Sequence, residues 1–369
     1  MGLTRVRLGD VISPIDERNA NLIKRVCGID KTKTFVPTKA NTSNVDLTKY
    51  KVVRLGRFGF SGMQTGRDKC IRVAMSRERA PFVISPAYTT FGVTDDSIDL
   101  TYLFMHFLSP EMDRKGWFYS DGSIRANLDW SVFCDIEIEL PPINLQRKYV
   151  AIYESMLANQ RAYESGLDDL KLACDVTIDK LVHNQPLQSI EPYVERHDIR
   201  NEDNSNKNVM GVSVTKTFRN PTAKVDVDNL ANYKIVKPSW FSFVQTTKNE
   251  KCFAFAFNDT GKNVVVTSVN EVFSVDEYQL CPEYLALLLN RSEFDRYAIF
   301  HSWGSARETF TWNDFLDVRI PLPDLEVQQS LGQLYKCWMK RRAINEHLKA
   351  QLKDICPVLI RGSIEESEG

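Results

Sequence analysis

The chain has 369 residues, with 47 lysines and arginines, 48 aspartates and glutamates, and a formal net charge of −1 at pH 7. Its hydrophobic fraction of 43% and charged fraction of 26% are ordinary for a globular protein, and the length allows two domains with separate cores. The sequence contains no run of roughly 18 apolar residues, so it predicts no membrane span, and residues 1–10 lack the apolar segment of a secretory signal. A near-neutral charge by itself argues against a freestanding nucleic-acid binder.

Charge is unevenly distributed along the chain. Residues 1–80 hold 17 Lys and Arg against 7 Asp and Glu, a net charge of +10, whereas residues 81–185 hold 8 against 16, a net charge of −8. The second half shows a weaker version, with a net charge of +2 over 186–264 and −5 over 265–369. Such segregation permits a basic face on a neutral protein, although solvated loop lysines would give the same counts.

The sequence repeats itself with an offset of 182 or 183 residues. Residues 32–35, Thr-Lys-Thr-Phe, return at 215–218, and Gly122-Ser-Ile-Arg125 returns as Gly304-Ser-Ala-Arg307. A repeat of about 180 residues has the size of a domain with an accessory element, not of a solenoid unit. The sequence therefore predicts two similar modules. The offset of 182 also relates Trp130 to Trp312, Phe133 to Phe315, Asp135 to Asp317, Pro141 to Pro323, Gln146 to Gln328 and Tyr153 to Tyr335.

The front of each repeat, 1–143 and 187–325, is predicted to be α+β. Short runs of β-branched and aromatic residues alternate with turns rich in Gly, Asn and Asp, which is typical of strands. Helical spacing of Leu and Phe predicts short helices over Thr101–Leu108 and Pro282–Asn290. The strand-like runs include 50–53, 71–75 and 82–84, and then 233–236, 253–257 and 264–267.

A long helix follows each front part after a proline stop, over 144–186 and again over 326–362. Apolar residues recur at three- and four-residue intervals in both, as in the seam of a coiled coil. A helix of about 38 residues is roughly 57 Å long. We expect the two helices to pack as an antiparallel coiled coil that fixes the distance between the front domains. Arg341 and Asn345 fall on or near the seam, where polar residues can fix register; residues 363–369 are expected to form a disordered tail.

The sequence lacks the signatures of common enzymes. It contains no G-x-x-x-x-G-K-[ST], H-E-x-x-H or G-x-S-x-G motif, so no catalytic residue is predicted. The pairs Asp95-Asp96 and Asp168-Asp169 are interpreted as solvated surface. The eight cysteines show no C-x-x-C spacing, which favours reduced thiols over a metal site.

The junctions between front domains and helices resemble specificity subunits of type I restriction–modification systems. In that family a glycine-rich loop precedes a strand, a Leu-Pro-Pro-like stop, a Glu-Gln-like pair and a long helix. Two departures occur at the helix entry, where Asp324 replaces Pro142 and where Leu145 and Val327 stand in place of the family's Glu. The segments that carry the resemblance are Gly122 to Trp130, Phe133, Ile138 to Ile143, Gln146, Gly304 to Arg307, Ile320 to Pro323, Gln328, and Met63 to Lys69, which resembles part of a target-recognition domain.

The resemblance implies two tandem target-recognition domains, 1–143 and 187–325, each reading one half of a split sequence in double-stranded DNA. It implies that the helices hold two modification methyltransferase subunits, which restriction ATPase/endonuclease subunits join. S-adenosylmethionine, and ATP with Mg, then bind to those partners, so this chain is expected to be a non-catalytic, cytoplasmic subunit without a cofactor, a metal or a membrane partner. A two-headed protein scaffold without DNA readout, and a nuclease with an unrecognised active site, are the alternatives.

Candidate DNA contacts follow from the chemistry of readout. Side-chain donors and acceptors on short loops read base edges, whereas Arg, Lys and hydroxyl groups hold phosphates. Arg67 suits guanine and Asn249 suits adenine at matching places, and Arg125 and Arg307, which recur in both repeats, suit the invariant phosphates. Structural roles within each domain are the alternative for all of these residues, and for the weaker candidates Lys33 and Lys216. The full set of candidates is Gln64, Arg67, Lys69, Ser123, Arg125, Gln245, Lys248, Asn249, Lys251, Ser305 and Arg307.

Overall fold

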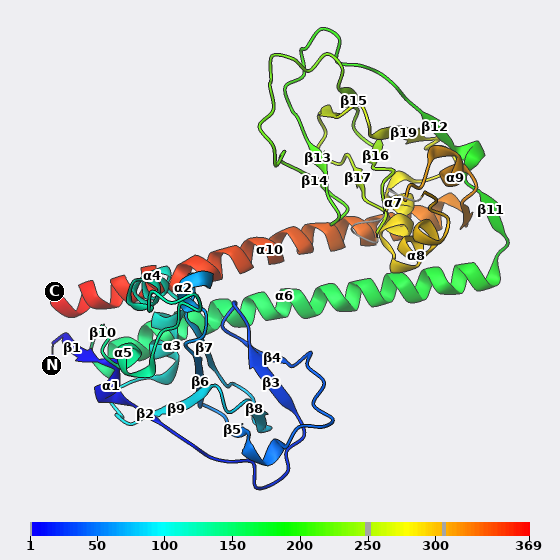
Figure 1. The fold of residues 1–369 in the computed structure, drawn as a ribbon. Coiled ribbons are helices and arrows are strands. Elements are labelled where there is room, and N and C mark those ends of the chain that lie inside the picture. Colours follow the sequence, from blue (N-terminus) through cyan, green and yellow to red (C-terminus); the bar gives the residue numbers. More distant parts are fainter. Residues whose placement is uncertain (1, 248–251, 305–307) are drawn as a thin grey trace. The chain divides into compact units, whose positions relative to one another are not determined.

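The computed structural model describes residues 2–247, 252–304 and 308–369. The chain forms two compact units (Figure 1): unit 1 comprises Met1–Ala162 with Asn345–Gly369, and unit 2 comprises Tyr163–Ile344. Each long helix therefore contributes one part to each unit, and each unit is described below by itself.

Unit 1 is built on two four-stranded sheets. Its strands are β1 (Thr4–Arg7), β2 (Ile12–Pro14), β3 (Val26–Ile29), β4 (Phe35–Pro37), β5 (Lys51–Val53), β6 (Phe58–Ser61), β7 (Arg72–Met75), β8 (Phe82–Ile84), β9 (Thr89–Val93) and β10 (Glu137–Leu140). The sheets have the orders β2-β9-β6-β7 and β4-β3-β8-β5, and all neighbours are antiparallel except β3 and β8. A separate antiparallel pair consists of β1, close to the N-terminus, and β10, the strand that precedes the first long helix.

Unit 1 also contains several short helices. They are α1 (Leu8–Val11), the 3-10 turn η1 (Leu47–Lys49), α2 (Thr65–Asp68), α3 (Leu100–Leu108), α4 (Pro110–Tyr119) and α5 (Trp130–Cys134). Asp99 caps α3 by accepting from the backbone N–H groups of Thr101 and Tyr102. Aromatic rings fill the core: Phe58 stacks on Phe91 across adjacent strands, with ring centroids 5.0 Å apart.

Unit 2 repeats this plan. Its strands are β11 (Leu187–Ser189), β12 (Val194–Arg196), β13 (Gly211–Val212), β14 (Phe218–Arg219), β15 (Lys234–Val236), β16 (Phe241–Phe243), β17 (Phe255–Phe257), β18 (Val264–Val266), β19 (Glu271–Val275) and β20 (Arg319–Pro321), and its short helices are η2 (Glu191–Tyr193), α7 (Pro282–Asn290), α8 (Ser292–Phe300) and α9 (Trp312–Leu316). The sheet β12-β19-β16-β17 matches β2-β9-β6-β7, whereas the strands that match the second sheet of unit 1 form two separate antiparallel pairs, β13 with β14 and β15 with β18. Even the stacked core pair recurs, with Phe241 and Phe273 at 4.8 Å in the matching places. The predicted duplication and α+β class are confirmed.

The two long helices are α6 (Ile143–Asn184) and α10 (Leu325–Glu368). They pack antiparallel, as predicted: in unit 1 the amide of Gln160 on α6 donates to Asn345 Oδ1 on α10 at 3.0 Å. Both side chains are buried, so Asn345 does lie on the seam. Because the start of one helix pairs with the end of the other, each unit packs its core against parts of both.

The end of α10 differs from the expectation. It continues to Glu368 where a disordered tail was expected from 363, and Pro357 lies inside the helix. Two contacts with the body of unit 1 explain the continuation. The buried hydroxyls of Ser363 and Tyr102 are 2.7 Å apart, and Glu366 pairs with Lys148 at the start of α6.

A glutamine repeated in both halves anchors the start of each long helix. Gln146 donates its amide to the carbonyls of Pro141 and Ser97 and accepts from the N–H of Asp99. Gln328 repeats the arrangement with Pro323, Gln279 and Cys281. Both glutamines are 1% exposed. Their recurrence in the sequence therefore reflects the joint between helix and domain.

Candidate functional site

The loop between β6 and β7 carries three of the predicted DNA-contact residues. It contains α2, which begins after Gln64 and ends before Lys69, and both of these residues adopt the left-handed backbone conformation with φ of 60° and 50°. Gly62 is required here, because a Cβ atom would lie 1.9 Å from the carbonyl oxygen of Leu128. The turn is thus a defined, closely packed structure and not an open glycine-rich loop.

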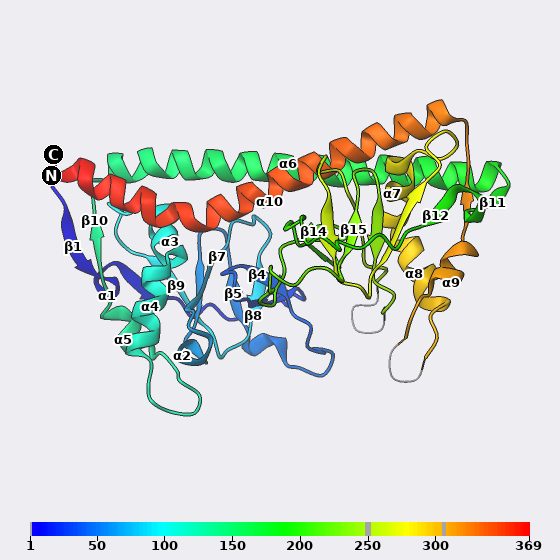
Figure 2. The ribbon, with the colours of Figure 1, turned by 90° about the horizontal axis from the view of Figure 1, so that it is seen from above.

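A second loop, 120–129, packs against the first. The backbone N–H of Leu128 donates to Gly62 O at 2.8 Å, and the N–H of Gly66 donates to Ala126 O at 2.9 Å. Figure 2 shows this loop, between α4 and α5, extending beyond α2. The structure therefore brings the predicted residues Gln64, Arg67 and Lys69 onto the same surface as the loop that carries Ser123 and Arg125. We call this surface, formed by residues 62–69 and 117–129, the α2 surface.

A single carboxylate organises the cations of the α2 surface. The Asp68 side chain is 5% exposed and pairs with Arg67 at 3.2 Å, with Lys31 at 3.3 Å and with Arg72. Although burial by itself would raise the pKa of Asp68, hydrogen bonds from these cations hold it below its usual value. The guanidinium of Arg67 also donates to the amide oxygen of Gln64, so these two predicted base contacts form one unit.

The side chains of the remaining candidates in unit 1 differ in the contacts that they make within the domain. The Ser123 hydroxyl donates to Asp121 Oδ1 at 2.6 Å, which also accepts from the N–H of Asn127, so Ser123 helps to shape its loop. Lys69 Nζ lies 4.4 Å from the centre of the Trp117 ring. Arg125 is exposed and has no ion-pair partner in the described part of the chain. This exposed guanidinium is available for a phosphate.

In unit 2 the matching loops pack in the same way. The N–H of Phe310 donates to Gln245 O at 2.8 Å, and the N–H of Thr247 donates to Glu308 O at 3.0 Å. The side chain of Gln245 is engaged, because its amide donates to the buried carboxylate of Glu271. The other candidates of this unit lie outside the described residues: Lys248, Asn249, Lys251, Ser305 and Arg307.

The weaker candidates Lys33 and Lys216 are structural, and the suggestion that they contact DNA is wrong. Lys33 is 4% exposed, and its ammonium donates to Asp113 at 2.7 Å and to the carbonyl of Phe107 in α3. Lys216 is 7% exposed and repeats the contacts with Asp295 and Leu289 O, each at 2.8 Å. The repeated Thr-Lys-Thr-Phe motif therefore places a lysine at a left-handed turn. In each unit the ammonium group of this lysine contacts two successive helices.

Sequence reasoning missed the aromatic residues at the end of α4. Trp117, Phe118 and Tyr119 are 49%, 81% and 48% exposed. They lie beside the cations of the α2 surface, since Lys69 rests on Trp117. Exposure cannot be read from the sequence of a short helix. The signal in the sequence is that Phe118 recurs as Phe300 at the offset of 182 residues, and in the structure Phe300 is also 80% exposed.

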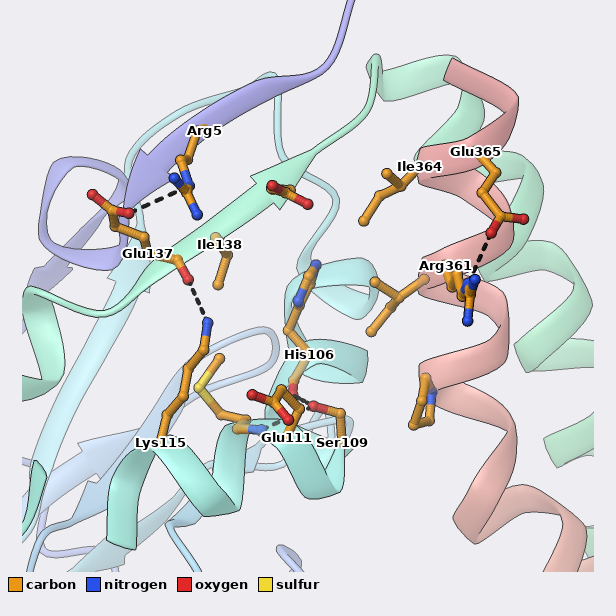
Figure 3. A pocket seen from close by; sticks show the side chains of 14 residues that line it. Arg5, His106, Ser109, Glu111, Lys115, Glu137, Ile138, Arg361, Ile364 and Glu365 are labelled. Carbon is orange, nitrogen blue, oxygen red and sulfur yellow. Dashed lines mark hydrogen bonds and ion pairs between the residues drawn. The ribbon is translucent and has the colours of Figure 1, made fainter. Parts of the chain in front are cut away.

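A cavity of about 460 Å³ in unit 1 lies between the β1–β10 pair, α3, α4 and the end of α10 (Figure 3). Its rim carries paired charges, Arg5 with Glu137 at 3.3 Å and Arg361 with Glu365 at 2.7 Å. Inside it, His106 is 8% exposed and its Nε2 has no hydrogen-bond partner among the described residues. Burial, and to a lesser degree the charge of Lys115, lower the pKa of His106 to about 4, so the imidazole is neutral at pH 7.

The matching place in unit 2 is occupied. The offset relates Ser109, Pro357 and Arg361, which line the cavity, to Arg291, Asp175 and Asp179. In unit 2 these three form an ion-pair group in which the Arg291 guanidinium, 8% exposed, bridges to both carboxylates, with Asp175 at 3.1 Å. In unit 1 the Ser109 hydroxyl instead donates to the carbonyl of His106. The cavity thus reflects divergence of the repeats at one structural joint.

Neither metal nor membrane chemistry is indicated by the described residues. Within 2–247, 252–304 and 308–369, no group of three or more His, Cys, Asp or Glu side chains is arranged to hold a metal ion. In the same ranges, no helix has the length and apolarity needed to cross a membrane. All eight cysteines are free of disulfide bonds, and Cys27, Cys174, Cys281 and Cys356 are buried.

No protein-family model and no curated protein matches the chain. Among solved structures, the S subunit of a type I restriction-modification system from M. genitalium matches 100% of this chain and 96% of that chain, with a TM-score of 0.60 and 10% identity. The HsdS subunit from Thermoanaerobacter tengcongensis matches 98% of this chain and 96% of its own, with a TM-score of 0.38 and 16% identity. A chain from a study of assembly and conformational transition of the type I R-M system matches 98% and 97%, with a TM-score of 0.45 and 15% identity. The first comparison shows that this chain has the fold of an S subunit.

Proposed function

We propose that this chain is the DNA sequence-recognition subunit of a type I restriction–modification complex and that it reads a target in two unlike halves. The observation that carries the proposal is the duplicated pairing of two loops, 62–69 with 120–129 and the matching pair in unit 2, each on one target-recognition domain. The S-subunit fold of the whole chain supports it. In unit 1 these loops present Gln64, Arg67, Lys69 and Arg125 together, which is the mixture of base-reading and phosphate-holding groups that DNA recognition requires.

The residues of the α2 surface are suited to two different kinds of DNA contact, to base edges and to phosphates. Arg67 has a side chain that is 59% exposed and is held by Asp68 and Gln64, so its guanidinium is pre-oriented for the edge of a guanine. Arg125 has no such support and suits a phosphate, which needs charge more than orientation. Lys69, resting on Trp117, is also placed for the backbone.

The partners are proposed to be two methyltransferase subunits and, in a restriction complex, ATPase/endonuclease subunits, all in the cytoplasm. Apolar side chains exposed on the long helices support protein docking there. Catalysis, S-adenosylmethionine and ATP with Mg would reside in these partners, and the present chain would be non-catalytic. The exposed side chains on the helices are Ile152, Leu172, Val176 and Val182 on α6, and Val327, Leu334, Ile344 and Val358 on α10.

The proposal is tested by sequencing methylated bases in a host with and without this gene, in the presence of its methyltransferase subunit. We expect one bipartite motif to disappear when the gene is deleted. Exchanging residues 1–143 for the matching domain of another such protein should change one half of the motif and leave the other intact. An unchanged methylation pattern would exclude DNA recognition and favour a protein scaffold, and cleavage of DNA by the purified chain with a divalent cation would favour a nuclease.

A further inference from the structure

Two exposed phenylalanines occupy matching places in the two units. Phe118 lies near the C-terminal end of α4 and Phe300 is the last residue of α8, and the offset between them is 182 residues. Their side chains are 81% and 80% exposed. Leaving a large apolar side chain in water forgoes the stabilisation that burial would give, and one such residue needs no explanation. Two at equivalent positions, exposed to the same degree, indicate a shared role.

The surroundings of the two rings also match. Each ring packs edge-on against the ring of the next residue, Phe118 against Tyr119 at 5.2 Å and 77°, and Phe300 against His301 at 5.1 Å and 81°. A near-perpendicular neighbour contacts a ring on one side, and most of each phenylalanine side chain stays exposed. The orientation is therefore maintained although the neighbour changes from Tyr to His.

The charge near Phe118 indicates what covers it. The α2 surface itself carries three cations, Arg67, Lys69 and Arg125. Lys31 and Arg72, which lie outside it in the sequence, pair with its Asp68 and bring the number of cations to five. Against them stand three carboxylates, Asp68, Asp121 and Asp129, of which Asp68 is 5% exposed and Asp121 holds the N–H groups of its own loop. A cationic surface with an exposed aromatic ring at its edge is complementary to a polyanion whose interior is a stack of flat rings.

We infer that Phe118 and Phe300 are apolar wedges that enter the base stack of DNA, one in each half-site. This inference rests on the proposed function and extends it by naming the contact that deforms the DNA. An aromatic side chain that enters between base pairs partly unstacks them and bends the duplex, so it favours steps that unstack easily. The wedges then contribute to specificity by a route separate from the hydrogen bonds of Arg67.

The test uses the full chain in complex with its methyltransferase subunit and a duplex selected by the wild-type complex from a random-sequence pool. Adenines in that duplex are replaced one at a time by 2-aminopurine, whose fluorescence rises on unstacking. We expect the wild-type complex to raise the fluorescence at one position in each half-site. Phe118→Ala should abolish the rise in one half-site only, Phe300→Ala in the other, and each should weaken binding about 10-fold to 100-fold.

Matched variants separate a wedge from a general apolar effect. Leu55→Ala in unit 1 and Tyr278→Ala in unit 2 remove side chains that are 59% and 92% exposed, and they should change neither affinity nor fluorescence. Phe118→Trp should keep the signal, because a larger ring still stacks, whereas Phe118→Lys should lose it while adding a charge.

Each failure has a different meaning. If the wild-type complex selects no sequence from the pool, the proposed function fails and the wedge with it. If it selects a sequence but Phe118→Ala and Phe300→Ala bind that duplex and unstack it as the wild type does, the wedge alone is refuted. If the variants fail to assemble with the methyltransferase subunit, the two rings are a protein-docking site and the inference is wrong.

Discussion

The buried imidazole of His106 makes a quantitative prediction about the stability of unit 1. In the unfolded chain a histidine titrates near its ordinary pKa of about 6.5, whereas in the folded protein burial lowers the pKa of His106 to about 4. Between these pH values the unfolded state therefore binds a proton that the folded state does not bind. The free energy of unfolding decreases as pH falls from about 6.5 towards 4. From these two values the loss between pH 7.5 and pH 5 is about 2 kcal/mol.

The natural substitution is His106→Leu, because the matching residue in α7 is Leu288, which is also buried. The free energy of unfolding of wild type and variant is measured by urea denaturation at pH 7.5 and pH 5. We expect the wild type to lose about 2 kcal/mol more than the variant over this interval. His347→Gln serves as a control, since His347 is exposed, and should behave as the wild type does. Equal pH dependence in wild type and His106→Leu would refute the assignment of a buried, neutral imidazole.

Three further predictions concern readout, the domain core and the helix pair. Arg67→Ala should relax recognition at one base position and weaken binding by ~1–3 kcal/mol, whereas Arg125→Ala should weaken binding to all sequences and reduce the salt dependence, both measured by titration of duplexes at several salt concentrations. Lys33→Met should lower the free energy of unfolding by about 3 kcal/mol, because it leaves the Asp113 carboxylate without its cation in a largely buried setting. One heptad inserted in both helices beside the Gln160–Asn345 pair adds about 10.5 Å, so the preferred gap between half-sites should grow by roughly three base pairs in a plasmid-methylation assay.

Each of these has a contradictory outcome. A change of base preference in Arg125→Ala, with none in Arg67→Ala, would reverse their roles. A Lys33→Met variant as stable as Lys39→Met, which alters an exposed lysine, would show that the buried ion pair contributes nothing. A folded, active heptad variant with an unchanged gap would show that the helices are only a docking surface.

The sequence predicted the elements whose pattern is long or repeated. Helix periodicity over ten turns identified α6 and α10, and Asn345 stood out because a polar residue interrupts an apolar seam. The end of α10 was missed because its last turns are acidic, and the contact that holds them, Tyr102 with Ser363, joins residues 261 positions apart. Such a contact leaves no local signal in the chain.

The sequence analysis placed Gln64, Arg67 and Lys69 on one loop but did not predict what packs against it. The structure shows that this loop packs against the loop of Ser123 and Arg125. The roles of Asp68 and of the exposed rings were not predicted, because both depend on which side chains burial leaves uncovered. Lys33 was misjudged for the same reason, since a lysine in a polar turn is normally solvated.

Comparison of the repeats separates scaffold from recognition. Residues that recur and are buried, such as Lys33 with Lys216 and Gln146 with Gln328, make the same internal contacts in both units and so maintain the domain. Under the proposed function, exposed residues that do not recur, such as Arg67, distinguish one half-site from the other.

The informative class is the third, residues that recur although they are exposed. Under the proposed function, their recurrence reflects something that both units touch and that is the same in each place. Phe118, which is as exposed as Phe300, fits a stack of bases, and Arg125, whose sequence match Arg307 lies outside the described residues, fits a phosphate. Both are features of every DNA sequence. Under the proposed function, the two units share one mode of contact with the duplex and read different bases through the residues between these fixed points.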